Sequence, residues 1–259
     1  MKHRTRKELL SSIPNGITKY NRTHACYNFA YQSFISSRSS GIAHHQGIET
    51  WLRSNEAGPS IRNLMDYFGM NAKGSRLISE EKFSASLQIL PDEVNIKILS
   101  AVKIPTGGLS APVDGIIIEE EIRSLFDFCA HKERFSESGG FVIGSKVSHC
   151  ILPELCPMLD GAHIANALYN VKREKYLPPG DNWKFFLGRD EKTPVNPSPK
   201  GNGRKNWDCY RYTQAIAFYE RIFTDWQNTQ ENSDLGKFLK LDPVQGTTGI
   251  PRILDKVLW

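Results

Sequence analysis

Residues 138–164 read SGGFVIGSKVSHCILPELCPMLDGAHI, and the interpretation of the whole chain starts from them. Gly144 follows the apolar residues 141–143, and glycine adopts the positive φ of a tight turn without steric strain. Lys146 comes two residues later. Its position predicts the first turn of a helix, which Pro153 must end because proline removes a backbone donor.

The second half of the stretch predicts another helix start. Pro157 restricts the backbone, and Asp160 stands where a helix needs an acceptor for its free N–H groups. Lys146 and Asp160 are 14 positions apart, and this pattern brings them back toward each other. Asp160 could be a plain helix cap, worth about 1 kcal/mol, and Lys146 a surface lysine that contacts a phosphate. Their combination with Gly144 favours a catalytic role.

The run Val142–Ile151 (VIGSKVSHCI) resembles the hairpin and second helix of the helix-hairpin-helix DNA glycosylases. In that superfamily an apolar-Gly-x-Lys turn precedes a helix, and an apolar-Pro-apolar-Asp segment follows. Residues 157–160 (PMLD) resemble that segment, with one extra residue between Pro and Asp. Val142 stands where the usual hairpin has its first glycine, and the interval from Lys to Asp is several residues shorter than usual.

The resemblance implies an all-α, glycosylase-like fold of two packed helical subdomains. It also implies that Lys146 is the nucleophile of a glycosylase with lyase activity and that Asp160 is the catalytic carboxylate. The backbone amides of Gly144 and Ser145 would hold a DNA phosphate. The partner would be DNA, no cofactor would be needed, and the substrate would be a damaged or modified base, including the hypermodified bases of phage DNA. The pathway would be DNA repair or phage defence.

Length and composition agree with an ordinary globular chain. The protein has 259 residues, of which 39% are hydrophobic and 24% charged, enough for a sizeable core. No apolar run approaches the roughly 18 residues of a membrane helix, and residues 1–7 are basic without the apolar segment of a signal peptide. We therefore expect a cytoplasmic monomer that does not bind membranes.

The cysteines indicate no metal site. The five cysteines are widely scattered, which predicts reduced and mostly buried thiols, with neither a zinc site nor an iron–sulfur cluster. His44 and His45 are adjacent, and neighbouring residues of a helix point in different directions. We therefore do not expect both to ligate one ion.

The net charge of +5 comes from one segment. Residues 172–205 contain nine Lys/Arg and four Asp/Glu, whereas the rest of the chain has 24 of each. Clustered basic charge suits a phosphate backbone, so Lys200, Arg204 and Lys205 are predicted to contact DNA. A solvated loop would explain the same charges equally well.

Apolar residues recur at helical spacing along most of the chain. Helices are expected over 6–12 (ending at Pro14), over 19–35, over 250–259, and after Asp114 as a helix cap. The Ile116–Ile118 triplet is compatible with a strand, but one triplet does not make a sheet. Core-facing residues of a further helix are Tyr212, Ile216, Tyr219, Phe223 and Trp226. The predicted organisation is one compact unit, 1–259, with an N-terminal helical subdomain (1–110) and a hairpin-containing subdomain (111–259).

The base pocket and the function class stay open at this point. Aromatic residues that could stack on an extruded base are Tyr27, Trp51, Trp183 and Trp207. The main alternative to a glycosylase is a non-catalytic helix-hairpin-helix protein that binds DNA. A metal-dependent nuclease is less favoured, because the carboxylates of Asp114 and residues 119–121 lie in a helical context without a lysine partner.

Overall fold

The computed structural model describes residues 6–71, 76–110, 112–159, 202–229, 234–244 and 249–258, and of residues 6–8 and 202–207 it describes only the backbone. Most of the described residues are helical, which confirms the all-α class. The helices are α1 (Arg6–Thr23), α2 (Ala25–His44), α3 (Ile48–Arg53), α4 (Ala57–Tyr67), α5 (Glu80–Glu93), α6 (Ile96–Ala101), α7 (Ile118–Ala130), α8 (Phe141–Ile151), α10 (Asn202–Thr229), α11 (Leu235–Leu239) and α12 (Ile250–Leu258).

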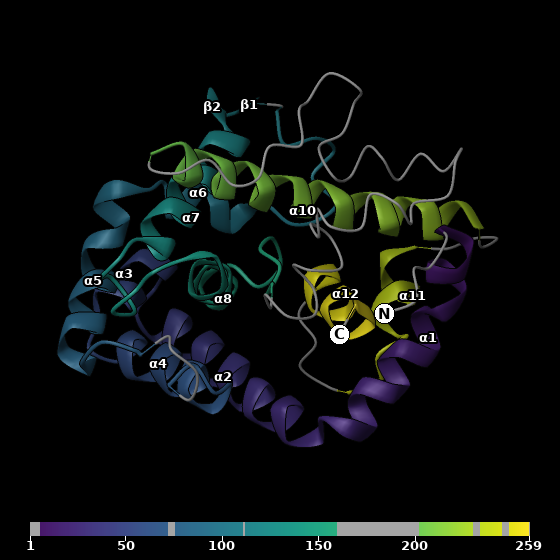
Figure 1. Ribbon diagram of the computed structural model, residues 1–259, viewed down its shortest axis with the longest axis horizontal. Coiled ribbons are helices and arrows are strands. Elements are labelled where there is room, and N and C mark those ends of the chain that lie inside the picture. Colours follow the sequence, from purple (N-terminus) through teal and green to yellow (C-terminus); the bar gives the residue numbers. More distant parts are fainter. Residues whose placement is uncertain are drawn as a thin grey trace.

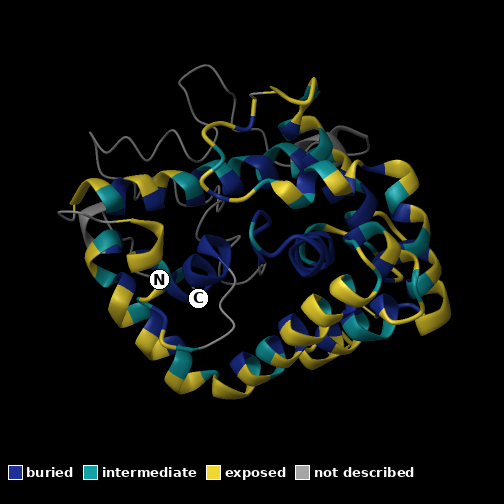
Figure 2. Ribbon diagram, turned by 180° about the vertical axis from the view of Figure 1, so that it is seen from behind, coloured by how far each residue is buried: buried dark blue, intermediate teal, exposed yellow. Residues whose placement is uncertain are grey.

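Helix α8 occupies the centre of the molecule. In Figure 1 it is seen end-on, with α7 and α10 on one side, α2 and α4 on the other, and α12 beside it. It packs most extensively against α7 and also contacts α4. Figure 2 shows α8 as dark blue throughout most of its length, because every residue from Ile143 to Ile151 is buried.

The first and last helices pack against each other. Helix α1 lies along α12, so the first and last helices are neighbours (Figure 1). Residues from the predicted N-terminal subdomain therefore pack directly on the C-terminal part. The subdomain boundary at residue 110 stays a prediction.

The N-terminal region differs from expectation in two ways. Helix α1 continues through Pro14, and the expected helix over 19–35 is interrupted at His24. A proline inside a helix removes one backbone hydrogen bond. Ile13 and Ile17 on either side of Pro14 are completely buried, and we attribute the continuity of α1 to this burial.

A small β-hairpin replaces the predicted cap at Asp114. Strands β1 (Pro112–Val113) and β2 (Ile116–Ile117) pair antiparallel. Asp114 and Gly115 connect them with φ values of 50° and 79°, as in the two-residue turns that Asp-Gly favours. Helix α7 begins only at Ile118, so the prediction that Asp114 caps this helix was wrong, and the strand alternative for the isoleucine triplet is confirmed at Ile116 and Ile117.

Three other predictions are confirmed. The stripe of residues from Tyr212 to Trp226 lies on α10 and is buried, and the last helix begins at Ile250. All five cysteines are free thiols, and four of them are buried. Each helix in the described parts of the chain is too short or too polar to cross a membrane.

Candidate functional site

Helix α8 combines a central position with polar residues. A completely buried helix is normally apolar all round, yet Ser145, Lys146, Ser148 and His149 are all buried here. Buried polar side chains are more informative than exposed apolar ones, because each needs a protein partner in place of the water that it loses. We therefore take α8 as the centre of the candidate site.

The glycine turn before α8 lies earlier than predicted. Gly139 and Gly140 have φ values of 64° and 112°, and the Gly140 N–H donates to the carbonyl of Ala130 at 2.7 Å. The chain thus reverses between α7 and α8 at this glycine pair. Gly144 lies inside α8, and its N–H donates to the Gly140 carbonyl at 3.0 Å, so the predicted turn with positive φ at Gly144 was wrong.

Gly144 has a packing role. A Cβ atom at this position would lie 2.7 Å from the Cβ of Ala130, a distance that packed carbon atoms do not tolerate. The absence of a side chain lets α8 approach the end of α7 closely. Because the Gly144 amide is used within α8, it does not offer the free N–H group that the predicted phosphate contact requires.

Ser145 links α8 to the segment that returns toward Asp160. Its Oγ accepts a hydrogen bond from the Leu159 N–H at 3.2 Å and lies 2.9 Å from the Leu159 carbonyl oxygen, to which it can donate. The whole residue, its backbone amide included, is completely buried, so Ser145 presents no exposed amide for the predicted phosphate contact. Asp160 itself lies outside the described residues.

Lys146 lies in the second turn of α8, one residue beyond Ser145. The sequence predicted it in the first turn, at the helix start. The residue is also buried, with only 5% of its surface exposed. Its Nζ atom is 3.4 Å from the sulfur of Met70 and 5.8 Å from the ring centre of Phe68. Lysine is rarely buried to this extent in proteins, and its surroundings here include soft and aromatic groups.

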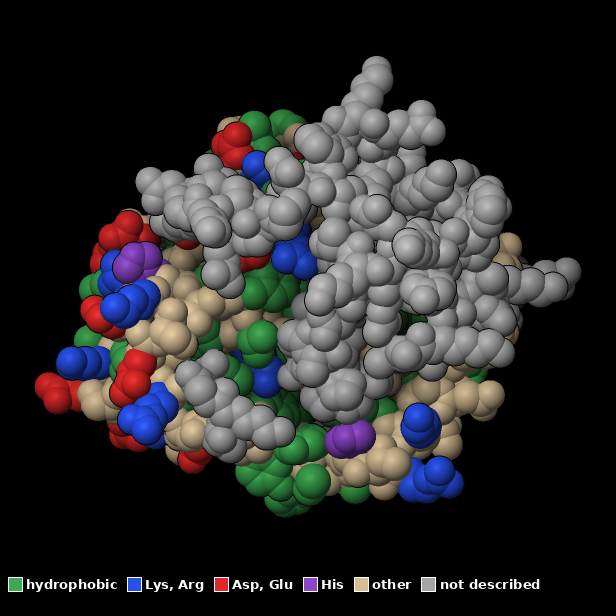
Figure 3. Space-filling view, in the orientation of Figure 1, with side chains coloured by type: hydrophobic (Ala, Val, Ile, Leu, Met, Phe, Trp, Pro, Cys, Tyr) green, Lys and Arg blue, Asp and Glu red, His purple; other side chains and the backbone are tan. Residues whose placement is uncertain are grey.

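Aromatic side chains continue outward from Phe68. Tyr27 meets Phe68 edge-on, with ring centres 5.7 Å apart, and meets Tyr67 at 6.0 Å. His24 stacks on Tyr27 at 5.7 Å. We call His24, Tyr27, Tyr67 and Phe68 the aromatic strip. Tyr67 is 48% exposed, and Figure 3 shows hydrophobic side chains gathered at the lower edge of this face, over α2.

Of the predicted base-pocket residues, the structure brings Tyr27 close to the surroundings of Lys146. Trp51 is instead a core residue, 1% exposed, and packs against Gly41, where a Cβ would come within 2.5 Å of its Nε1. It therefore has no free ring face for a base. Trp183 lies outside the described residues, and Trp207 belongs to the part of α10 described only by its backbone.

The structure describes only part of the basic segment 172–205 that is predicted to contact DNA. Arg204 and Lys205 lie in the first turns of α10, where only the backbone is described, and Lys200 lies outside the described residues. Their contact with DNA stays a prediction.

His149 is a neutral structural residue. Its Nδ1 lies 2.6 Å from the carbonyl oxygen of Cys156, which can only accept, so Nδ1 carries the proton. Its Nε2 then accepts from the hydroxyl of Tyr31 at 2.8 Å. Burial lowers the pKa of His149 from 6.5 to about 3, so the imidazole is neutral near pH 7.

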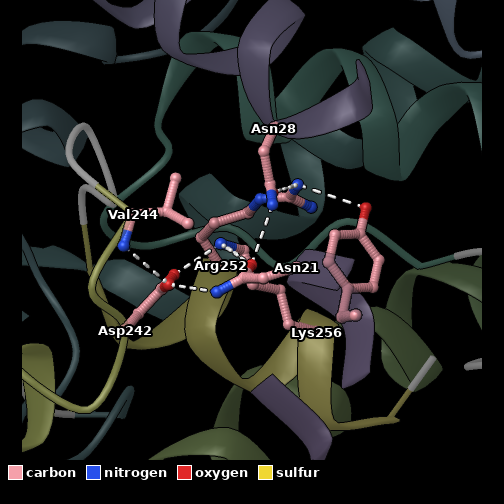
Figure 4. A network of polar contacts seen from close by, with 7 residues as sticks. Asn21, Asn28, Asp242, Val244, Arg252 and Lys256 are labelled. Carbon is pink, nitrogen blue, oxygen red and sulfur yellow. Dashed lines mark hydrogen bonds and ion pairs between the residues drawn. The ribbon is translucent and has the colours of Figure 1, made fainter. Parts of the chain in front are cut away.

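A second polar cluster ties α12 to the N-terminal helices (Figure 4). Asp242 accepts hydrogen bonds from Lys256 Nζ and from Asn21, the latter at 2.9 Å. Arg252 donates to the hydroxyl of Tyr20 at 3.2 Å and to Asn28 at 3.4 Å. The sequence carried no signal for this cluster, because Tyr20, Asn21 and Asn28 lie more than 200 positions from the C-terminal residues that they contact.

This cluster is connected to α8. The guanidinium of Arg252 lies 4.5 Å from the ring centre of Tyr31, and Tyr31 is bonded to His149. Asp255 on α12 accepts from Tyr219 at 2.8 Å and from the Met158 N–H at 3.1 Å. Burial raises the pKa of Asp255 from 3.8 to about 7. Helix α12 therefore holds both α8 and the segment before Asp160.

A pocket of about 170 Å³ opens at the C-terminal end of α8. Arg38 lines it and donates to the carbonyls of Cys150 and Ile151, which caps the helix. None of the predicted site residues that the structure describes lines this pocket. The other lining residues are Ile35, Ser39, Ser100, Val102, Leu152, Pro153, Glu154 and Leu155.

Comparison with protein-family models, with curated proteins and with solved structures gives no significant match.

Proposed function

We propose that the protein is a DNA glycosylase that removes a damaged or modified base, with Lys146 and Asp160 as its reactive pair. The hydrogen bond between Ser145 and Leu159 carries the proposal. It joins the chain neighbour of Lys146 to the chain neighbour of Asp160, two residues that are 14 positions apart in the sequence. Such a contact favours a shared site for the lysine and the carboxylate.

The burial of Lys146 supports the same proposal. Removing an ammonium group from water is costly, so buried lysines mark functional sites more often than exposed ones do. A weakly polar environment favours the neutral amine, which is the form that can act as a nucleophile. The contacts of Nζ with Met70 and Phe68 place the amine inside the protein, unlike a lysine that binds phosphate at the surface.

The aromatic strip supplies a surface for the extruded base. Base excision requires the target nucleotide to leave the duplex, and aromatic rings compensate for the lost stacking. Tyr27 and Tyr67 are accessible, while Phe68 lies between them and Lys146. In this arrangement the base would stack on the strip while its sugar approaches the lysine.

The chemistry follows from these positions. The bond between C1′ and the base nitrogen breaks, the base leaves with the bonding electrons, and the sugar becomes oxocarbenium-like. The carboxylate of Asp160 stabilises this positive charge. Either Lys146 Nζ or a water molecule then bonds to C1′. Attack by Lys146 opens the sugar and leads to a Schiff base, whereas water gives the abasic site directly.

Borohydride trapping tests this proposal. Duplexes carrying oxidised, alkylated, deaminated or hypermodified bases are screened for release of free base without added metal. Borohydride should then link the protein covalently to the substrate, and Lys146→Gln should abolish the adduct. Lys146→Met keeps the length and packing of the side chain but removes the amine. If this variant also forms no adduct, the amine itself is required. Lys132→Gln, at an exposed lysine, is the matched control.

The other outcomes separate the alternatives. Base release without an adduct makes water the nucleophile and leaves Lys146 a positioning or structural role. DNA binding without base release from any duplex contradicts the glycosylase and supports a non-catalytic DNA-binding protein. Strand cleavage that requires magnesium supports a nuclease.

A further inference from the structure

The end of α2 brings two adjacent histidines to one side. Helix α2 ends at His44, where the backbone forms the two hydrogen bonds of a Schellman motif and Gln46 takes φ = 58°. The expectation that adjacent histidines diverge applies within a helix, and here the helix stops between them. The ring centres of His44 and His45 lie 4.9 Å apart at an interplanar angle of 80°.

The start of α4 adds a carboxylate to this pair. Glu56 occupies the N-cap position of α4, but its side chain makes no capping hydrogen bond. A Glu56 carboxylate oxygen lies 3.3 Å from Nε2 of His45 instead. His44, His45 and Glu56 each offer one ligand atom, and these three atoms all lie within 4.8 Å of one another.

His45 has an unused ligand atom. Its Nε2 is buried, and no hydrogen-bond partner for it exists among the described residues, since the contact with Glu56 lacks hydrogen-bond geometry. A buried polar atom without a hydrogen bond costs about 1–3 kcal/mol. Coordination of a metal ion would use this nitrogen and the facing carboxylate together.

We propose that His44, His45 and Glu56 form a zinc-binding site that joins the end of α2 to the start of α4. Two imidazoles and one carboxylate are ligands that Zn²⁺ accepts, and three protein ligands leave a fourth position for water. Bonds of about 2.0–2.1 Å place tetrahedral ligand atoms about 3.4 Å apart. The three side chains reach this spacing by small rotations, because His44 and Glu56 are exposed.

The site has a structural consequence that does not depend on the proposed function. Tyr27 lies on α2, and Tyr67 ends α4. These two helices pack against each other, and a metal ion bound at their other ends would hold them together. Zinc is therefore expected to raise the melting temperature of the protein.

Calorimetric titration of the full-length, untagged protein with ZnCl₂ tests the site. One Zn²⁺ per chain is expected, with a parallel increase in melting temperature, while Mg²⁺ and Ca²⁺, which prefer all-oxygen ligand sets, should not bind. His44→Gln, His45→Gln and Glu56→Gln should each weaken zinc binding at least about tenfold, the loss that even outer-shell changes cause. His131→Gln, at an exposed histidine, should bind zinc like the unchanged protein.

Two further measurements make the result decisive. Glu56 is exposed and makes no capping bond, so Glu56→Gln should keep the circular dichroism of the parent and exclude misfolding as the cause. Cys26→Ser removes the exposed thiol, which is a competing zinc ligand. The proposal is overturned if zinc does not bind, if all three site variants bind it normally, or if Cys26→Ser abolishes binding.

Discussion

His149 and Asp255 are buried titratable residues whose pKa values are shifted in opposite directions. Burial lowers the pKa of His149 to about 3 and raises that of Asp255 to about 7. Between pH 3 and 6.5 the unfolded chain binds more protons at His149, so that residue makes stability increase with pH. Between pH 3.8 and 7 the folded chain binds more protons at Asp255, so that residue makes stability decrease with pH.

We predict that single variants of His149 and Asp255 separate their opposing effects on the pH dependence of the free energy of unfolding. Asp255→Asn should leave the His149 contribution, so its stability should rise with pH between about 4 and 6.5. His149→Gln should show the reverse trend in that window. Each contribution amounts to about 1.4 kcal/mol per pH unit at most. Urea unfolding at several pH values measures both slopes, and identical slopes in the parent and both variants would contradict the assignment.

The role of Asp160 can be separated from that of a helix cap. Asp160→Asn should abolish base release while leaving DNA affinity and helix content nearly unchanged, because asparagine caps a helix about as well as aspartate. Asp234→Asn is the matched control, since Asp234 caps α11 by accepting from the Lys237 N–H at 2.7 Å. If Asp160→Asn loses structure but keeps its specific activity, Asp160 is only a cap.

At the scale of elements, the contact between α7 and α8 depends on small residues. Gly144 faces Ala130, and the two helices approach until a Cβ on Gly144 would overlap that side chain. This contact holds Ser145 and Lys146 in the middle of the molecule. Helix propensity alone would favour alanine over glycine by about 1 kcal/mol.

Gly144→Ala should therefore destabilise the protein, although Gly144 lies inside a helix. Overpacking should outweigh the gain in propensity and lower the free energy of unfolding by about 1–3 kcal/mol. The double variant Ala130→Gly/Gly144→Ala should recover part of this loss, because it removes the shortest contact, whereas the Cα and N atoms of Ala130 stay 3.0 and 3.1 Å from the new Cβ. Chemical denaturation of both single variants and the double variant measures the coupling. A double variant that is no more stable than Gly144→Ala would contradict the overlap of the two Cβ atoms as a cause of the loss.

At the scale of the whole molecule, charge is distributed unevenly. The excess of basic residues in 172–205 equals the net charge of the complete chain. If this segment faces a phosphate backbone, each contact releases counterions, and DNA affinity falls steeply with salt.

Replacing Lys200, Arg204 and Lys205 together by glutamine should weaken DNA binding for all sequences. The slope of log affinity against log salt should become shallower by roughly 0.9 for each lost phosphate contact. Replacing Lys132, Lys237 and Lys240, which are exposed, provides a control with the same change in charge. Fluorescence anisotropy between low and moderate salt measures the slopes, and equal effects of the two triple variants would place the contact elsewhere.

The sequence by itself determined the local features of this protein. The stripe from Tyr212 to Trp226, the helix that ends before Pro153 and the last helix all follow from apolar spacing and proline position. These signals act over a few turns of one segment. Local reasoning was wrong where two conformations were both allowed: Gly144 lies inside a helix, and Asp114-Gly115 forms a hairpin turn.

Only the tertiary structure decided which residues surround Lys146. Phe68 and Met70 come from a segment more than 70 positions away. Arg252 reaches Tyr20 across 232 positions of the chain. No spacing within one segment indicates such neighbours, because they depend on how whole helices pack. The burial of α8 has the same origin. Its polar residues would predict a helix at the surface, and it is the packing of the surrounding helices that excludes water from them.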